Sequence, residues 1–107
     1  MIRIAVCDDE NVIVNQIEHI ISEVCKWESI PVNIDVFYSG RELKRQVTSG
    51  TKYDIIFLDI QMKGGDGIIA AENIRKVDDN VLLIYVSGYD KYMMELFRLD
   101  VFGFIKK

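Results

Sequence analysis

The sequence predicts an α/β domain built on a mostly parallel sheet with helices on both of its faces. Short apolar runs alternate along the chain with segments whose apolar residues recur at helical spacing. Two of these runs are apolar at nearly every position, as in strands that are buried on both faces. At 107 residues, half of them apolar and without a linker or repeat, the chain is expected to form one domain spanning residues 1–107.

The amino-terminal part of the chain is predicted to form a strand, a helix and a second strand. Ile2–Cys7 is mostly apolar and is expected to be the first strand. Val12–Trp27 has the spacing of an amphipathic helix, which Asp9 or Asn11 is expected to cap. The alternation of apolar and polar residues over Val32–Phe37 then predicts a less buried strand.

The middle of the chain is predicted to form two helices around a buried strand. Ser39 and Glu42 have the spacing of a capping box, so a short helix is expected from there to about Gly50. The run Tyr53–Asp59 is apolar until its final carboxylate and predicts a strand buried on both faces. A third helix is outlined by apolar residues at helical spacing, namely Ile69, Ala70, Ile74 and Val77.

The last part of the chain is predicted to add two strands and one helix. Val81–Val86 and Val101–Ile105 are expected to be strands, with a helix over Lys91–Leu99 between them. A fifth helix would normally follow and cover the sheet face on which the first helix packs, so the domain is expected to be truncated at its carboxyl end. The uncovered apolar strip predicts dimer formation or exchange of elements between copies. The residues expected on this strip are Ile20, Val24 and Phe102.

Composition excludes several classes of function for this segment. A net charge of −4 and a pI near 4.9 argue against direct nucleic-acid binding. Cys7 and Cys25 lack metal-ligand spacing and are expected to be buried thiols in a reducing cytoplasm, rather than a disulfide or a redox pair. No signal peptide or membrane-spanning run is recognisable, so a cytoplasmic location without membrane contact is expected.

Polar side chains follow four of the predicted strands at the point where each strand ends. Because the carboxyl ends of parallel strands open on one edge of a sheet, these groups are expected to converge. They are Asp8 and Asp9, then Asp59, then Ser87, and finally Lys106 or Lys107. Two carboxylates about 4 Å apart repel by roughly 4 kcal/mol at an effective dielectric constant near 20. The site must therefore bind a cation, keep a carboxylate protonated or use a lysine as counter-charge.

The chemistry that fits this set of residues is phosphoryl transfer. Carboxylate and backbone oxygens are ligands that suit Mg²⁺ and leave coordination positions open for phosphate. A lysine and a serine hydroxyl can stabilise the equatorial oxygens of a transferring phosphoryl group. Asp59 is the natural nucleophile in such a site, since aspartyl phosphates are established covalent intermediates. Turn capping by Asp59 is the structural alternative.

Four separated motifs, in this order, resemble the receiver domain of two-component response regulators. The motifs are Cys7-Asp8-Asp9-Glu10, Phe57-Leu58-Asp59-Ile60-Gln61-Met62 with Asp66-Gly67, Val86-Ser87-Gly88, and Gly103-Phe104-Ile105-Lys106-Lys107. The resemblance covers the whole chain. It implies a flavodoxin-like, doubly wound parallel five-stranded sheet of order 2-1-3-4-5, here with the last helix missing.

The resemblance also implies a phosphoacceptor and a metal site. Asp59 corresponds to the phosphoacceptor, which takes a phosphoryl group from a sensor histidine kinase. Asp8 and Asp9 correspond to the acidic pair that holds Mg²⁺ together with Asp59. The backbone carbonyl of Gln61 is expected to be a further ligand of this ion.

Three more residues match the positions that respond to phosphorylation in this family. Ser87 corresponds to the hydroxyl that moves toward the phosphoryl group. Lys107 corresponds to the lysine that pairs with it, and Lys106 is the alternative if the register differs by one residue. Phe104 occupies the aromatic switch position, where the family more often has tyrosine. Lys63 replaces a common proline, and the chain ends at Lys107, where the family usually continues.

The stretch Ser87-Gly88-Tyr89-Asp90-Lys91-Tyr92 resembles receivers of the group that carries a LytTR-type DNA-binding domain. By this resemblance, residues 1–107 are a receiver whose output domain is absent and through which the full protein would contact DNA. The surface of the helix Lys91–Leu99 would then change on phosphorylation. Two alternatives stay open: a receiver-like interaction module that takes no phosphate, and a Mg²⁺-dependent phosphatase or phosphotransferase acting on small molecules.

Overall fold

The fold is known from a computed structural model, which describes residues 1–60, 62, 66–87 and 103–106 of the chain. Strands and helices alternate in these residues until β4, as the apolar pattern predicts. The elements are β1 (Ile2–Cys7), α1 (Asn11–Trp27), β2 (Val32–Phe37), α2 (Gly40–Thr48), β3 (Ile55–Asp59), α3 (Asp66–Val77), β4 (Leu82–Ser87) and β5 (Gly103–Lys106).

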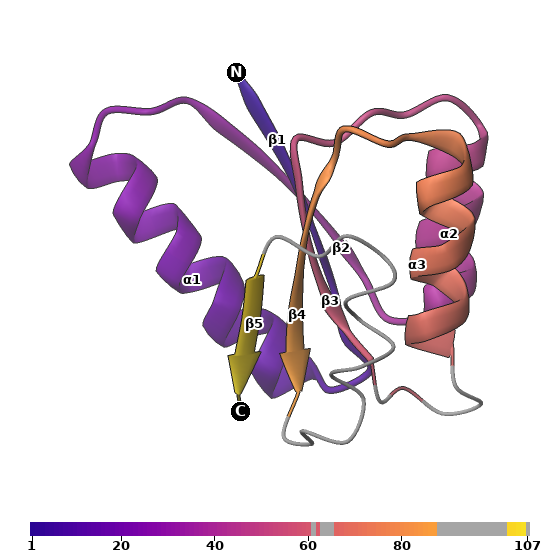
Figure 1. Ribbon diagram of the computed structural model, residues 1–107. Coiled ribbons are helices and arrows are strands. Elements are labelled where there is room, and N and C mark those ends of the chain that lie inside the picture. The colour runs from indigo at the N-terminus through magenta and orange to yellow at the C-terminus, as the bar shows by residue number, and fades with distance from the viewer. Residues whose placement is uncertain (61, 63–65, 88–102, 107) are drawn as a thin grey trace.

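The strands form one sheet in the order β2-β1-β3-β4-β5, and every neighbouring pair is parallel. Figure 1 shows α2 and α3 together on one face of this sheet and α1 on the other. The α/β class and the order of the first four strands are therefore confirmed. The predicted helix over Lys91–Leu99 and the residue Phe102 lie outside the described residues.

Two apolar cores flank the sheet because successive side chains of a strand point to opposite faces. In β1, Ala5 and Cys7 belong to the core under α2 and α3, whereas Ile4 and Val6 belong to the core under α1. All four residues are at most 4% exposed. Burial on both faces explains why β1 and β3 are apolar along almost their whole length.

The two helices that follow β1 and β2 begin in different ways. Ser39 caps α2 by accepting a hydrogen bond at its Oγ from the Glu42 amide at 3.2 Å, as the capping box predicts. The cap predicted for α1 is wrong, because its N-cap is Glu10 and carries no side-chain capping bond. The Glu10 amide instead donates to Asp8 Oδ1 at 2.9 Å, so the turn before α1 is held by the preceding carboxylate.

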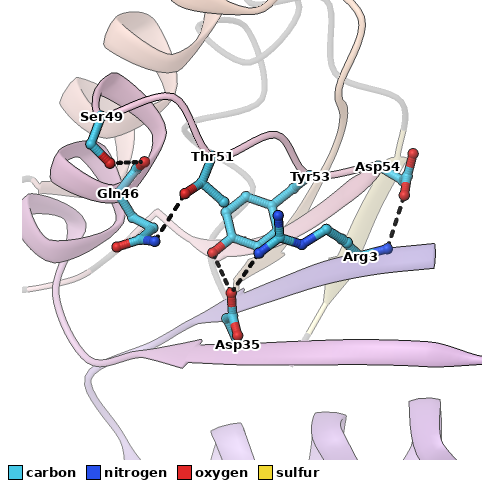
Figure 2. A network of polar contacts seen from close by, with 7 residues as sticks. All are labelled: Arg3, Asp35, Gln46, Ser49, Thr51, Tyr53 and Asp54. Carbon is cyan, nitrogen blue, oxygen red and sulfur yellow. Dashed lines mark hydrogen bonds and ion pairs between the residues drawn. The ribbon is translucent and has the colours of Figure 1, made fainter. Parts of the chain in front are cut away.

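A network of polar contacts joins β1, β2 and the residues that precede β3 (Figure 2). The Tyr53 hydroxyl donates to Asp35 Oδ2 at 2.6 Å, and Arg3 Nη2 lies 3.7 Å from the same oxygen. The Arg3 guanidinium also stacks over the Tyr53 ring at 5.5 Å, and the Arg3 amide donates to Asp54 Oδ2 at 2.9 Å. These contacts tie the strands together near the amino-terminal ends of β1 and β3, far along the strands from their carboxyl ends.

An open apolar groove of about 350 Å³ runs between α1 and the sheet. The side chains of Ile20 and Val24 on its rim are 60% and 56% exposed, which confirms their predicted position on an uncovered strip. The groove is lined by Ile2, Ile4, Ile20, Ile21, Val24, Cys25, Ile30, Ile55 and Phe57. Cys7 and Cys25 are both buried and are not joined in a disulfide, as predicted. None of the helices in the described part of the chain is long and apolar enough to cross a membrane.

Candidate functional site

Two aspartates lie at the carboxyl-terminal ends of adjacent strands of the sheet. Cys7 of β1 pairs in register with Leu58 of β3, so the next residues, Asp8 and Asp59, end these adjacent strands together. Asp8 is 1% exposed and Asp59 is 2% exposed. The strand register therefore brings the backbones of these two residues to the same edge of the sheet, where the apolar runs that precede them predict a site.

The surroundings of the two carboxylates are apolar on the side of the sheet that faces α2 and α3. Cys7 and Leu58, the residues directly before them, are at most 1% exposed. Met62 is also buried, and its Sδ lies 3.8 Å from Cys7 Sγ, whose thiol donates to the Ser39 carbonyl at 3.4 Å. Charges beside such a buried apolar surface interact more strongly than charges in water.

An acidic group that could hold a metal ion follows β1. Asp8, Asp9 and Glu10 each offer a carboxylate oxygen, and these oxygens lie within 4.8 Å of one another. Asp8 is buried, whereas Asp9 and Glu10 are exposed, so an ion could be bound from the solvent side. Hard carboxylate oxygens at this spacing fit Mg²⁺. Glu10 was not among the predicted ligands, although its place directly after the acidic pair is a signal that the sequence contains.

The other predicted site residues are described only in part. Ser87 is the last residue of β4 and pairs in register with Lys106 of β5, so both reach the same edge of the sheet as Asp59. Phe104 pairs with Tyr85 in the same ladder. For these positions in β5 and for Ser87 only the backbone is described. Gln61 and Lys107 lie outside the described residues.

The domain is thus a parallel α/β sheet with acidic residues at the carboxyl ends of adjacent strands, and these residues could hold a cation. A family model described as the response regulator receiver domain matches residues 4–107. The chain therefore belongs to the receiver-domain family of two-component response regulators. Domains of this family generally bind Mg²⁺ at an acidic site and interact with sensor histidine kinases.

Two known regulatory proteins are similar to the chain over nearly its whole length. It is 26% identical over 107 residues to the sensory transduction protein LytT of Bacillus anthracis, covering 100% of this chain and 42% of the relative. It is 26% identical over 102 residues to the transcriptional regulatory protein LytR of Staphylococcus aureus strain N315, covering 95% of this chain and 39% of the relative. The chain thus spans about two fifths of the length of these relatives.

A solved structure agrees with this assignment. The response regulator protein TrrA of Thermotoga maritima, in complex with Mg²⁺-BeF, superimposes on the chain with a TM-score of 0.83 at 30% sequence identity. The match covers 100% of this chain and 87% of that one. The receiver fold inferred from the motifs is thereby confirmed.

Proposed function

We propose that this domain is a phosphoacceptor that takes a phosphoryl group from a sensor histidine kinase onto Asp59. The observation that carries the proposal is the position of Asp59, which is 2% exposed at the end of β3 and lies beside the equally buried Asp8. In an open α/β sheet the carboxyl ends of the strands are where ligands bind, so a carboxylate in this position can act as a nucleophile toward a group bound there. The related TrrA was solved in complex with Mg²⁺-BeF, which supports a role for Mg²⁺ in this domain.

The chemistry assigned to Asp59 is a simple displacement at phosphorus. A carboxylate oxygen of Asp59 forms a bond to the phosphorus atom of a phosphohistidine on the kinase, and the phosphorus–nitrogen bond breaks. The leaving imidazole takes up a proton, and the product is an aspartyl acyl phosphate. Later attack by water at the same phosphorus returns the free carboxylate and inorganic phosphate.

The residues that would hold Mg²⁺ are Asp8, Asp9 and Asp59, with the backbone carbonyl of Gln61. When bound, the ion supplies positive charge that stabilises the oxygens of the transferring group. Asp8 is held for this role by the hydrogen bond from the Glu10 amide to its Oδ1. We assign to Lys107 the pairing of its ammonium group with the phosphoryl oxygens.

The phosphorylated state would be transmitted by Ser87 and Phe104, which we assign as the switch residues. The added charge attracts the Ser87 hydroxyl and shifts the population of the conformations that follow β4. The similarity to LytT and LytR supports a role in the control of transcription through a DNA-binding output domain outside residues 1–107. A cytoplasmic location follows from this role.

Self-association is the second part of the proposal. The apolar groove beside α1 and the exposed side chains of Ile20 and Val24 form a surface that water solvates poorly. A second copy of this chain is the partner that we propose for it, and receiver domains often dimerise.

The phosphoacceptor role is tested by incubating the chain with acetyl phosphate and Mg²⁺ and measuring its intact mass. One phosphoryl adduct, stable in acid and labile in base, is expected on the unaltered chain. The Asp59→Asn variant is expected to form none. Asp79→Asn is a matched control, because Asp79 is an exposed aspartate that precedes β4 at the opposite edge of the sheet.

Two outcomes would contradict the proposal. An adduct that persists in Asp59→Asn would assign the phosphoryl group to another residue. No adduct on a folded chain that binds Mg²⁺ would favour the receiver-like interaction module that takes no phosphate. Omission of Mg²⁺ is expected to abolish the adduct, which distinguishes the site reaction from surface acylation.

A further inference from the structure

Gly67, the second residue of α3, lies directly against the backbone at the end of β3. A Cβ atom built on Gly67 would lie 2.5 Å from Ile60 Cα and 2.9 Å from the Ile60 carbonyl carbon. It would lie closer still to the carbonyl oxygen of Asp59. The three nearest atoms are all backbone atoms, so side-chain rotation cannot relieve these contacts.

The contact couples the position of α3 to that of Asp59. Carbon atoms pack at about 3.5–4.0 Å, so a side chain at position 67 would force the two backbones apart by roughly 1 Å. Both elements are held elsewhere, since Ala71 and Ile74 of α3 and Leu58 of β3 are at most 1% exposed in the same core. The displacement is therefore expected to concentrate at the junction, where Asp59 lies.

We infer that Gly67 is a positioning residue for the Asp59 carboxylate. By bringing the first turn of α3 into contact with the Asp59–Ile60 peptide, it determines where the carboxylate stands relative to Asp8 and to an incoming phosphoryl group. The inference rests on the proposed function, because it names the residue that places its nucleophile. Displacement of a reacting atom by about 1 Å can lower a rate by about 100-fold.

The test compares Gly67→Ala with Gly50→Ala. Gly50 has a φ of +111° and no atom within 4 Å of its Cβ position, so alanine there strains the backbone of a remote turn without touching the site. Both variants are expected to melt at a lower temperature. Only Gly67→Ala is expected to lower the maximal rate of phosphorylation by acetyl phosphate, by 10- to 100-fold. Its affinity for Mg²⁺, measured by calorimetry without phosphodonor, is expected to fall as well.

The possible results separate the inference from the proposed function. If the unaltered chain forms no adduct, the proposed function fails, while the Mg²⁺ titration still tests the placement of Asp59. If the unaltered chain reacts and the two alanine variants equal it in rate and Mg²⁺ affinity, the inference about Gly67 is wrong. Failure of Gly67→Ala to fold, even at 5 °C with a stabilising osmolyte, would also overturn it, because residue 67 would then determine folding and not placement.

Discussion

The Tyr53 hydroxyl donates a 2.6 Å hydrogen bond to Asp35 Oδ2 across 18 residues of sequence. The bond joins Tyr53, which lies shortly before β3, to the middle of β2. Arg3 of β1 approaches the same carboxylate oxygen at 3.7 Å. Tyr53 and Arg3 thus share one acceptor of β2 on the sheet face covered by α2 and α3, so three chain segments meet there (Figure 2). This contact and the core around it lead to predictions about stability that are independent of the phosphoacceptor role.

Tyr53→Phe is expected to destabilise the domain by about 1–2 kcal/mol. The substitution removes the hydrogen bond to a charged acceptor but keeps the ring, which packs edge-on against Phe37 with a centroid distance of 6.3 Å. Urea denaturation followed by circular dichroism measures the change. Combination with Asp35→Asn in a double-mutant cycle isolates the pair, and a coupling energy of zero would show that the bond contributes nothing.

Tyr85→Phe is expected to change the stability of the domain in the opposite direction to Tyr53→Phe. The Tyr85 side chain is fully buried under α3, and among the residues that the structure describes its hydroxyl has no hydrogen-bond partner. An unsatisfied buried hydroxyl costs about 1–3 kcal/mol, so its removal should leave stability unchanged or raise it by about 1 kcal/mol. The same urea experiment serves as the measurement, and a loss above about 1 kcal/mol would contradict the prediction.

Stability is expected to fall above pH 10 because of these same tyrosines. Burial, followed by the hydrogen bond to Asp35 and the negative charge of Asp35, raises the pKa of Tyr53 above its ordinary value, against a smaller opposing effect of Arg3. Burial likewise raises the pKa of Tyr85. A tyrosine whose pKa is higher in the folded state than in the unfolded chain contributes stability that is fully present below pH 10. This stability is lost as the pH rises and the tyrosine ionises in the unfolded chain. The free energy of unfolding is expected to fall by at most about 1.4 kcal/mol per pH unit for each tyrosine.

The measurement is the urea midpoint at pH 9 and at pH 11. Each phenylalanine variant should lose less stability between these values than the unaltered chain, while the effect of lysine deprotonation is common to all. Equal losses in the three proteins would show that neither tyrosine is responsible.

The exposed apolar face of α1 is expected to make the chain self-associate. A single charged residue on this face is expected to weaken the association. Val24 is 56% exposed beside the apolar groove, and Val24→Lys would place an ammonium group in that surface. Loss of one valine side chain that is buried in the interface between two copies lowers the binding free energy by about 1.5 kcal/mol or more. The dissociation constant then rises at least about tenfold.

Light scattering over a concentration series measures this change. Val77→Lys is the matched control, because Val77 is a 48% exposed valine of α3 on the opposite face of the sheet. A monodisperse monomer for the unaltered chain at every concentration would contradict self-association. Equal effects of the two lysines would indicate a general effect of charge.

The burial pattern of the strands explains how much of the fold and site could be predicted. The runs before Asp8 and Asp59 are apolar on both faces, so the strands and their parallel direction follow from sequence periodicity and the rules of crossover connections. The order of the strands followed only from the resemblance to receiver domains. The cap of α2 was equally readable, because Ser39 acts on a residue three positions away. The cap of α1 was not, because its N-cap residue, Glu10, makes no side-chain capping bond and its amide donates to the Asp8 carboxylate.

The sequence by itself thus determined the class of the domain, its element order until β4 and the identity of its acidic residues. Each of these depends on local periodicity or on residue type. The contact of Gly67 with the Asp59–Ile60 backbone, the shared acceptor Asp35 and the full burial of Tyr85 were decided only by the tertiary structure. They depend on how closely α3, β2 and β3 approach one another in space, and that separation is set by the packing of the whole core.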